Sequence, residues 1–177
     1  GVVATYGSSE TSGGCVYDGV PLDGVAVELD PDGRIRLGGP MLFDAYEGDP
    51  TLTAATLVDG RFVTSDLGRW REDGRLQVLG RIDDVAISGG VNVPTPAVAA
   101  RLREHPALAA VEVLGVPDPE WGERVVAFVV GDLSLEELRE FVATELPRAW
   151  APRQVVPLGA LPLLTNGKTD RTALKEL

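Results

Sequence analysis

The stretch TYGSSETSGG, residues 5–14, combines the residue types that a nucleotide-binding loop uses. Glycine permits close approach of the backbone to a ligand, serine and threonine offer hydroxyl groups, and Glu10 offers a hard oxygen ligand suited to magnesium. The alternative interpretation is an ordinary turn, because Gly/Ser/Thr clusters are typical of turns. The stretch also lacks the Gly-Lys-Ser/Thr ending of a P-loop.

Three further polar segments follow or interrupt apolar runs: TSDLGRW at 64–70, GRIDDVAISGGVNV at 80–93 and LLTNGKTDR at 163–171. Asp66 can accept hydrogen bonds from ribose hydroxyls, Arg81 can add donors, and Lys168 can offer a mobile cation to a phosphate or carboxylate. Taken alone, each segment also fits a helix cap, a surface ion pair or a hairpin turn. Their joint occurrence in this order favours a site that activates a nucleotide.

Composition excludes some classes of function. The 177 residues carry a net charge of −11, and the 16 Lys and Arg residues are scattered, which argues against a nucleic-acid partner. No run of about 18 apolar residues predicts a membrane span, and the start lacks the regions of a signal peptide. The one cysteine, Cys15, fits a reducing compartment and is expected to be a small buried residue. We therefore expect a soluble, cytoplasmic protein, and the apolar start without methionine suggests a cut made inside a fold.

The scaffold is predicted to be β-rich up to about Gly80. The pairs Asp32-Gly33, Asp59-Gly60 and Asp73-Gly74 are hairpin signals. The flanking segments read as short strands of a small barrel-like or sandwich-like unit: residues 24–30, 34–40, 54–58, 61–66 and 75–81.

Beyond Arg81 the pattern becomes mixed α and β. Helices are predicted over 94–105, over the segment that begins at Ser134, and at the C-terminus, with strands at 109–118, 123–132 and 153–159. Ser134 and Glu137 form a capping box, and apolar residues then recur at helical spacing up to Pro147. Residues 161–171 are predicted to be an extended loop with an Asn-Gly turn. A domain boundary is expected between residues 80 and 84.

In this order the four segments resemble the adenylate-forming superfamily of acyl-CoA synthetases, peptide-synthetase adenylation domains and luciferases. The resemblance covers nearly all of the chain, and matches the second half of such an enzyme. It implies that residues 1–80 are the β-rich, distorted barrel-like end of a large domain, 81–84 a hinge, and 85–177 a small α+β cap domain. The phosphate loop and most of the large domain would lie before Gly1.

The resemblance also implies roles for the first polar segment. Tyr6 corresponds to the aromatic residue that packs on adenine, and Gly7 belongs to the same nucleotide-binding segment. Ser9 corresponds to the hydroxyl beside the α-phosphate, where threonine is commoner, and Glu10 to the magnesium-binding glutamate.

The other segments receive roles in the same way. Asp66 resembles the aspartate that binds the ribose hydroxyls, with Arg81 assisting, and Lys168 the lysine that bridges the substrate carboxylate and phosphate. Asp83 resembles the hinge of the small domain. The loop that lines the channel for the pantetheine of CoA contains Gly89 and Gly90. Two departures, Ser65 for glycine and Ala97 for glutamate, put no catalytic role in doubt.

The implied activity is ligation of a carboxylate to CoA through an acyl-adenylate, with ATP and CoA as substrates and Mg²⁺ as metal. The run GGCVYDGVPLDGV, residues 13–25, resembles the o-succinylbenzoate:CoA ligases of menaquinone synthesis; the alternative is a linker turn. Two other functions remain open: an adenylation domain that loads a carrier protein, and a non-catalytic nucleotide-binding module. The intact set of Glu10, Asp66, Arg81 and Lys168 disfavours the module.

Overall fold

The computed structural model describes residues 2–177 and divides into two compact units. The first extends to Ile82 and the second covers Asp83–Leu177. The division falls inside residues 81–84, the predicted hinge; that these residues act as a hinge stays a prediction. Each unit has its own apolar core.

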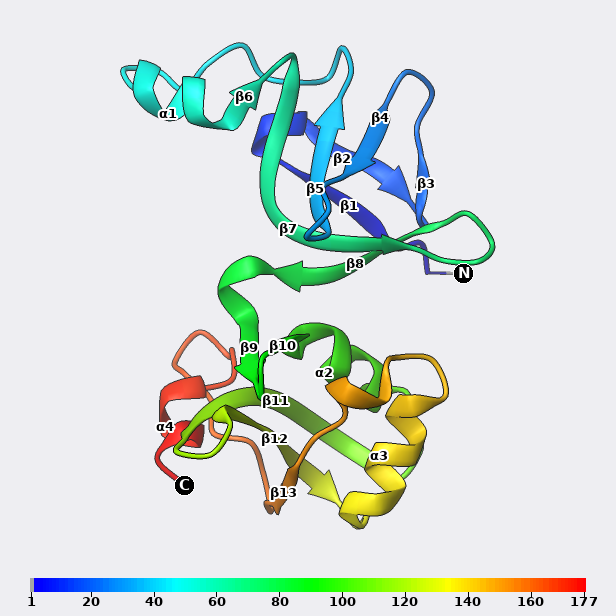
Figure 1. The fold of residues 1–177 in the computed structure, drawn as a ribbon, viewed down its shortest axis with the longest axis vertical. Helices are drawn as coiled ribbons and strands as arrows, with labels where there is room; N and C mark the ends of the chain where they lie inside the picture. Colours follow the sequence, from blue (N-terminus) through cyan, green and yellow to red (C-terminus); the bar gives the residue numbers. More distant parts are fainter. Residues whose placement is uncertain (1) are drawn as a thin grey trace. The chain divides into compact units, whose positions relative to one another are not determined.

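The first unit consists of two antiparallel sheets (Figure 1). The smaller has the order β1-β2-β3, with β1 at Thr5–Ser8, β2 at Gly13–Tyr17 and β3 at Val20–Pro21. The larger has the order β4-β5-β7-β6, with β8 paired to β7; its strands are Ala26–Leu29 (β4), Arg34–Gly38 (β5), Leu57–Val58 (β6), Arg61–Trp70 (β7) and Leu76–Arg81 (β8). A 3₁₀ turn, η1 at Ser9–Thr11, connects β1 to β2.

Strand β7 curls the larger sheet. Its first half pairs with β6 and β5, its second half pairs with β8, and the register shifts between Leu67 and Gly68. A bulge of this kind bends a strand, and Figure 1 shows the bend in β7. A Cβ on Gly68 would crowd the buried Ile35 side chain, 2.9 Å from its Cδ1. The three Asp-Gly hairpins are confirmed as the β4–β5, β6–β7 and β7–β8 connections.

One strand prediction in this unit was wrong. Residues 54–56 were expected to begin a strand, but they end helix α1, Pro50–Thr56. Asp49 caps this helix by accepting a hydrogen bond from the Leu52 amide, and Pro50 occupies its first turn. The Asp-Pro start signal therefore outweighed the β-branched residues that follow it.

The second unit is built on a five-stranded sheet with the order β10-β9-β12-β11, in which β13 pairs parallel to β12. Its strands are Val85–Ser88, Val91–Pro94, Leu108–Asp118, Gly122–Gly131 and Gln154–Pro157, numbered β9 to β13. The helices are α2 at Thr95–Arg103, α3 at Leu135–Ala143 and α4 at Arg171–Lys175, with short 3₁₀ turns at Ile82–Asp84 (η2) and Arg148–Trp150 (η3).

Apolar residues cover both faces of this sheet. Val125, Ala127 and Val129 of β12 pack in the core that includes residues of α2 and α3, whereas Val126 and Phe128 pack in a second cluster with Leu174 of α4. Successive side chains of a strand point to opposite faces, so a strand buried on both faces reads as a continuous apolar run. The predicted capping box of α3 is confirmed, because the Ser134 amide donates to Glu137 at 2.8 Å. Among the described residues no helix is long and apolar enough to cross a membrane.

Candidate nucleotide-binding and catalytic site

Tyr6 and Asp66 are 60 positions apart in the sequence but meet in the first unit. The Tyr6 hydroxyl donates a hydrogen bond to Asp66 Oδ2 at 2.8 Å. Strand β1 holds Tyr6 against the core of the unit, while β7 presents Asp66 just before its bulge. Burial, and then the Asp66 carboxylate, raise the pKa of the Tyr6 phenol far above its ordinary value. The phenol is therefore a hydrogen-bond donor throughout the physiological pH range.

The backbone around Asp66 is fixed by Thr64, which is 3% exposed. Its hydroxyl donates to the Ile35 carbonyl at 2.8 Å and accepts from the Asp66 amide at 3.0 Å. On the other side, Asp66 lies opposite Arg81 in the β7–β8 ladder. The β7–β8 ladder thus places Asp66 beside Arg81, and the hydrogen bond from Tyr6 joins Asp66 to the smaller sheet.

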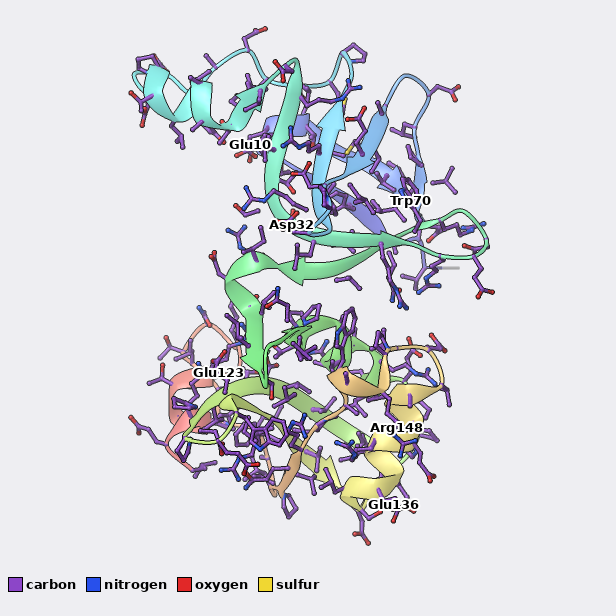
Figure 2. The ribbon with its side chains drawn as sticks, viewed as in Figure 1. Glu10, Asp32, Trp70, Glu123, Glu136 and Arg148 are labelled. Atoms are coloured by element: carbon purple, nitrogen blue, oxygen red, sulfur yellow. The ribbon has the colours of Figure 1, made fainter. Side chains whose placement is uncertain are left out.

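Glu10 is positioned by a second tyrosine. It lies in η1 and its Oε1 accepts a hydrogen bond from the Tyr46 hydroxyl at 2.8 Å; the position of Glu10 on the first unit can be followed in Figure 2. The Tyr46 ring packs against Phe43 with centroids 4.7 Å apart. The bond from Tyr46 is the main cause that lowers the pKa of Glu10. This carboxylate is consequently ionised at neutral pH, the state that a metal ligand needs.

Two other residues of the predicted site, Ser9 and Gly7, lie near Glu10 in the sequence. Ser9 is exposed at the start of η1 and can present its hydroxyl to a ligand. Gly7 has a structural reason for its identity, because a Cβ there would lie 2.0 Å from the Gly13 carbonyl oxygen on β2. The close approach of β1 and β2 therefore requires glycine at this position.

The remaining predicted site residues belong to the second unit. Lys168 is exposed at the tip of a small hairpin, in which Leu163 pairs with Thr169 and the Leu164 amide donates to the Lys168 carbonyl at 2.8 Å. The predicted Asn-Gly turn is confirmed, since Gly167 has φ of +81° and its amide donates to the Leu164 carbonyl. Asp83 lies in η2, at the start of the unit.

Gly89 and Gly90 form the turn between β9 and β10, with φ of +59° and +78°. A Cβ on Gly89 would lie 2.7 Å from the Trp121 ring, and the Gly89 amide donates to the Trp121 carbonyl at 2.9 Å. The guanidinium of Arg153 stacks on that ring, 3.5 Å from a ring centroid. The Trp121 ring therefore packs directly against this turn.

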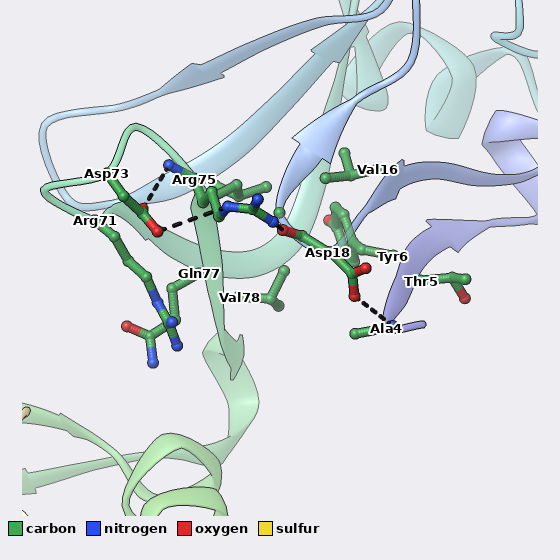
Figure 3. Close-up of a pocket in the computed structure, with 12 residues that line it drawn as sticks. Ala4, Thr5, Tyr6, Val16, Asp18, Arg71, Asp73, Arg75, Gln77 and Val78 are labelled. Atoms are coloured by element: carbon green, nitrogen blue, oxygen red, sulfur yellow. Dashed lines mark hydrogen bonds and ion pairs between the residues drawn. The ribbon is translucent and has the colours of Figure 1, made fainter. Parts of the chain in front are cut away.

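A cavity of about 710 Å³ in the first unit is separate from most of these residues (Figure 3). Tyr6 is the one candidate residue in its lining, and its charged groups include Asp18, Arg71 and Arg75. The Arg75 Nη1 donates to the Asp18 carbonyl at 2.7 Å. The cavity therefore does not by itself define the candidate site.

Sequence reasoning missed Tyr46 and Trp121, whose partners are distant in sequence and which no local motif marks. It singled out residues 64–70 but gave no role to Thr64. Tyr46 is followed within four residues by Asp49-Pro50, a helix-start signal that could have placed it beside a helix, but nothing in the sequence links it to Glu10.

Comparisons with known proteins agree with this architecture. Residues 97–168 match the family model of the AMP-binding enzyme C-terminal domain. The chain is 46% identical, over 98% of its length, to a protein of Mycobacterium tuberculosis named as a probable 2-succinylbenzoate–CoA ligase, and spans 47% of that protein. It is also 34% identical to gramicidin S synthase 2 of Brevibacillus brevis, over 81% of the chain and 3% of that protein.

Among solved structures, the chain is similar to o-succinylbenzoate CoA synthetase (MenE) of Bacillus subtilis, determined in complex with the acyl-adenylate intermediate. The TM-score is 0.77 at 28% identity, over 99% of this chain and 41% of that one. Residues 97–168 are therefore identified as an AMP-binding enzyme C-terminal domain, and the chain as a whole is similar to the C-terminal half of the adenylate-forming enzymes. It spans about half the length of the M. tuberculosis relative and a smaller share of the other two proteins.

Proposed function

We propose that these residues form the C-terminal part of an AMP-forming acid:CoA ligase, which adenylates a carboxylate with ATP and then transfers the acyl group to CoA. The observation that carries the proposal is the hydrogen bond between Tyr6 and Asp66. The family resemblance assigns these two residues to the adenine and the ribose of one nucleotide. Their direct contact supports that assignment, because the two parts of a nucleoside are adjacent.

The first half-reaction brings two anions together, the acid and the α-phosphate of ATP. In the proposed site the Tyr6 ring packs on adenine, Asp66 accepts from the ribose hydroxyls, and Ser9 donates to the α-phosphate. Lys168 then supplies a cation to the carboxylate and the phosphate, where charge develops. Its exposed hairpin supports this role, since a lysine that is not held in a core can reach an incoming ligand.

Glu10 is a suitable ligand for Mg²⁺. Its Oε1 is held by Tyr46, and among residues 2–177 no other His, Cys, Asp or Glu joins it in a cluster of three or more. Mg²⁺ is commonly bound through one or two carboxylates together with substrate phosphates and water, so a single well-oriented carboxylate fits. The metal would supply positive charge to the phosphates, and the contribution of the chain is to keep Glu10 ionised and oriented.

The second half-reaction requires Lys168 to withdraw and a thiol to approach. We assign the rotation to Asp83, at the boundary of the two units, and the channel for the pantetheine to the Gly89–Gly90 turn. A turn of two glycines leaves no side chain to obstruct a narrow ligand, and the Trp121 contact keeps it rigid. One hinge can thus serve both half-reactions.

For the acid we propose o-succinylbenzoate, and hence a place in menaquinone synthesis in the cytoplasm. The support is the 46% identity to the M. tuberculosis protein together with residues 13–25. The alternative is an adenylation domain that loads a carrier protein, favoured by the 34% identity to gramicidin S synthase 2.

The test uses the complete enzyme that contains these residues. Acid-dependent pyrophosphate exchange is measured with o-succinylbenzoate, benzoate and a medium-chain fatty acid, and thioester formation is measured with CoA and with a phosphopantetheinyl carrier protein. We expect exchange with o-succinylbenzoate and thioester on CoA. Exchange with another acid would overturn the substrate, thioester on the carrier alone would favour the alternative, and no exchange with any acid would refute the activity.

The 177 residues expressed alone provide a second test. Because they span 47% of the M. tuberculosis relative, we expect a folded chain that releases no AMP from ATP and acid. Robust turnover by the chain alone would contradict the assignment of further catalytic parts to the rest of the enzyme.

A further inference from the structure

Arg171, the first residue of α4, contacts two carboxylates from distant parts of the second unit. Its Nη1 lies 2.6 Å from Asp84 Oδ1, and its Nε lies 2.9 Å from Glu112 Oε1. Glu112 is 6% exposed on β11, so its charge needs a partner. Its other contact is Arg103 at the end of α2, at the longer distance of 3.6 Å. Arg171 is therefore the main counter-charge of a buried carboxylate.

Arg171 also marks the base of the hairpin that carries Lys168. The Asp170 amide donates to the Pro162 carbonyl at 2.8 Å, which closes the hairpin. The Asp170 side chain caps α4 by accepting from the Thr172 and Ala173 amides, and Leu174 is fully buried. Because α4 has only five residues, it depends on this cap, on the buried Leu174 side chain and on the Arg171 ion pairs.

Asp84, one of the two carboxylates that Arg171 contacts, lies at the start of the second unit. Asp84 directly follows Asp83, and the Asp84 carbonyl accepts a hydrogen bond from the Thr95 hydroxyl at the start of α2 at 2.9 Å. One guanidinium thus connects the base of the Lys168 hairpin to the residue next to the proposed hinge. The residues that it joins, 84 and 171, are 87 positions apart.

We propose that Arg171 is a positioning residue, which locks the Lys168 hairpin to the start of the second unit so that rotation about Asp83 carries Lys168 as part of one rigid body. The proposal rests on the proposed function for the role of Lys168, whereas the contacts themselves lie within the second unit. A guanidinium is suited to this task because its fixed fork can hold two carboxylates at once, which the point charge of a lysine does not do.

The competing interpretation is an ion-pair network that stabilises the fold without guiding Lys168. Arg103 provides the matched control, since it pairs with Glu112 but not with Asp84. We compare Arg171→Met, Arg171→Lys and Arg103→Met in the complete enzyme. Hydrogen exchange of the Leu164, Gly167 and Asp170 amides, measured without substrates, reports the order of the hairpin.

With Arg171→Met we expect exchange of these three amides to accelerate about tenfold or more, and adenylation, measured as kcat/KM in pyrophosphate exchange, to fall about tenfold. Thioester formation from preformed acyl-adenylate should change less than about twofold, because Lys168 takes no part in that step. Arg171→Lys should recover part of both losses, and Arg103→Met should leave both within about twofold.

Unchanged hydrogen exchange of the three amides in Arg171→Met would overturn the proposal. Equal losses in the two half-reactions would also overturn it, because they would indicate general destabilisation. An equal effect of Arg103→Met would also overturn it. If the unmodified enzyme activates no acid, the proposed function fails, but hydrogen exchange of the three amides still decides whether Arg171 orders the hairpin.

Discussion

Replacing Tyr6 by phenylalanine removes one hydroxyl and keeps the ring. The lost group is the donor of the 2.8 Å bond to Asp66 Oδ2. The ring would still pack on the core of the first unit, so the change isolates the hydrogen bond. Asp66 would keep the amide contact with Thr64 that fixes its backbone, but its carboxylate would lose the Tyr6 donor.

The size of the effect on stability follows from the burial of the pair. A hydrogen bond to a charged group contributes roughly 1.5 to 3 kcal/mol when it is enclosed. Asp66 is half-buried, so water replaces part of the lost bond, and we expect the free energy of unfolding to fall by about 1 kcal/mol. The more exposed Tyr17 is the matched control, and Tyr17→Phe should change the free energy of unfolding by less than about 0.5 kcal/mol.

The pH dependence gives a second measure of the surroundings of the Tyr6 phenol, because burial, and then the Asp66 carboxylate, raise its pKa. The folded state raises the pKa of Tyr6 above its ordinary value, so the proton stays on the phenol after the unfolded chain has lost it. The stability advantage of the unmodified chain over the Tyr6→Phe variant is therefore full below about pH 10 and shrinks as the pH rises further. Urea unfolding of both forms between about pH 7 and about pH 11 measures this difference.

The Tyr6→Phe change should also alter how well the complete enzyme distinguishes ATP from its deoxy analogues. If the Tyr6 hydroxyl orients Asp66 toward the ribose, the complete enzyme should prefer ATP over 2′-deoxy-ATP or 3′-deoxy-ATP, and Tyr6→Phe should reduce this preference by about tenfold, mainly through KM for ATP. An unchanged preference, with the free energy of unfolding lowered as expected, would refute the link between the hydrogen bond and ribose binding. An unchanged free energy of unfolding would refute the hydrogen bond itself.

Three other substitutions test the remaining assignments. Lys168→Ala should lower adenylation by about 10² to 10³, or about 3 to 4 kcal/mol, because it removes a cation from developing charge; thioester formation from preformed adenylate should continue, and an equal loss there would contradict the role. Asp83→Pro should fix φ at about −65° and impair thioester formation more than pyrophosphate exchange; equal loss in both would argue against the hinge. Tyr46→Phe should raise the magnesium concentration needed for half-maximal activity. Its cost in stability should be full above about pH 4.5 and decline as the pH falls further, through the lowered folded-state pKa of Glu10; an identical metal requirement would separate Tyr46 from the metal site.

Much of the fold could be predicted from local signals. Each Asp-Gly pair marks a turn whose backbone favours glycine, so the three hairpins of the first unit followed from the sequence. The capping box at Ser134 placed the start of α3 for the same reason. Strand β7 was predicted to end at Asp66 but continues to Trp70, because the bulge at Gly68 lets the strand bend and pair with β8.

The candidate residues could be named from their segments, but their supports could not. Tyr46 contacts Glu10 across 36 positions, and Arg171 contacts Glu112 across 59. Such pairs depend on the register of strands and on the way in which short helices pack, and neither leaves a local pattern. Glu112 in particular lies within an apolar run, where one carboxylate gives no sign of which cation it will meet.

The two units hold their candidate groups in different ways, and the proposed chemistry explains the difference. In the first unit, Tyr6, Asp66 and Arg81 are set by paired strands, and a β-ladder keeps its register while a nucleotide enters and leaves. In the second, Lys168 lies on a short hairpin, and we propose that the ion pairs of Arg171, at the base of that hairpin, hold it to the rest of the unit. A nucleoside must stay bound through both half-reactions, whereas the lysine is needed in the first and obstructs the second. A rigid ladder for the groups that remain, and a small unit that moves as one body for the group that leaves, satisfies both demands with a single point of rotation.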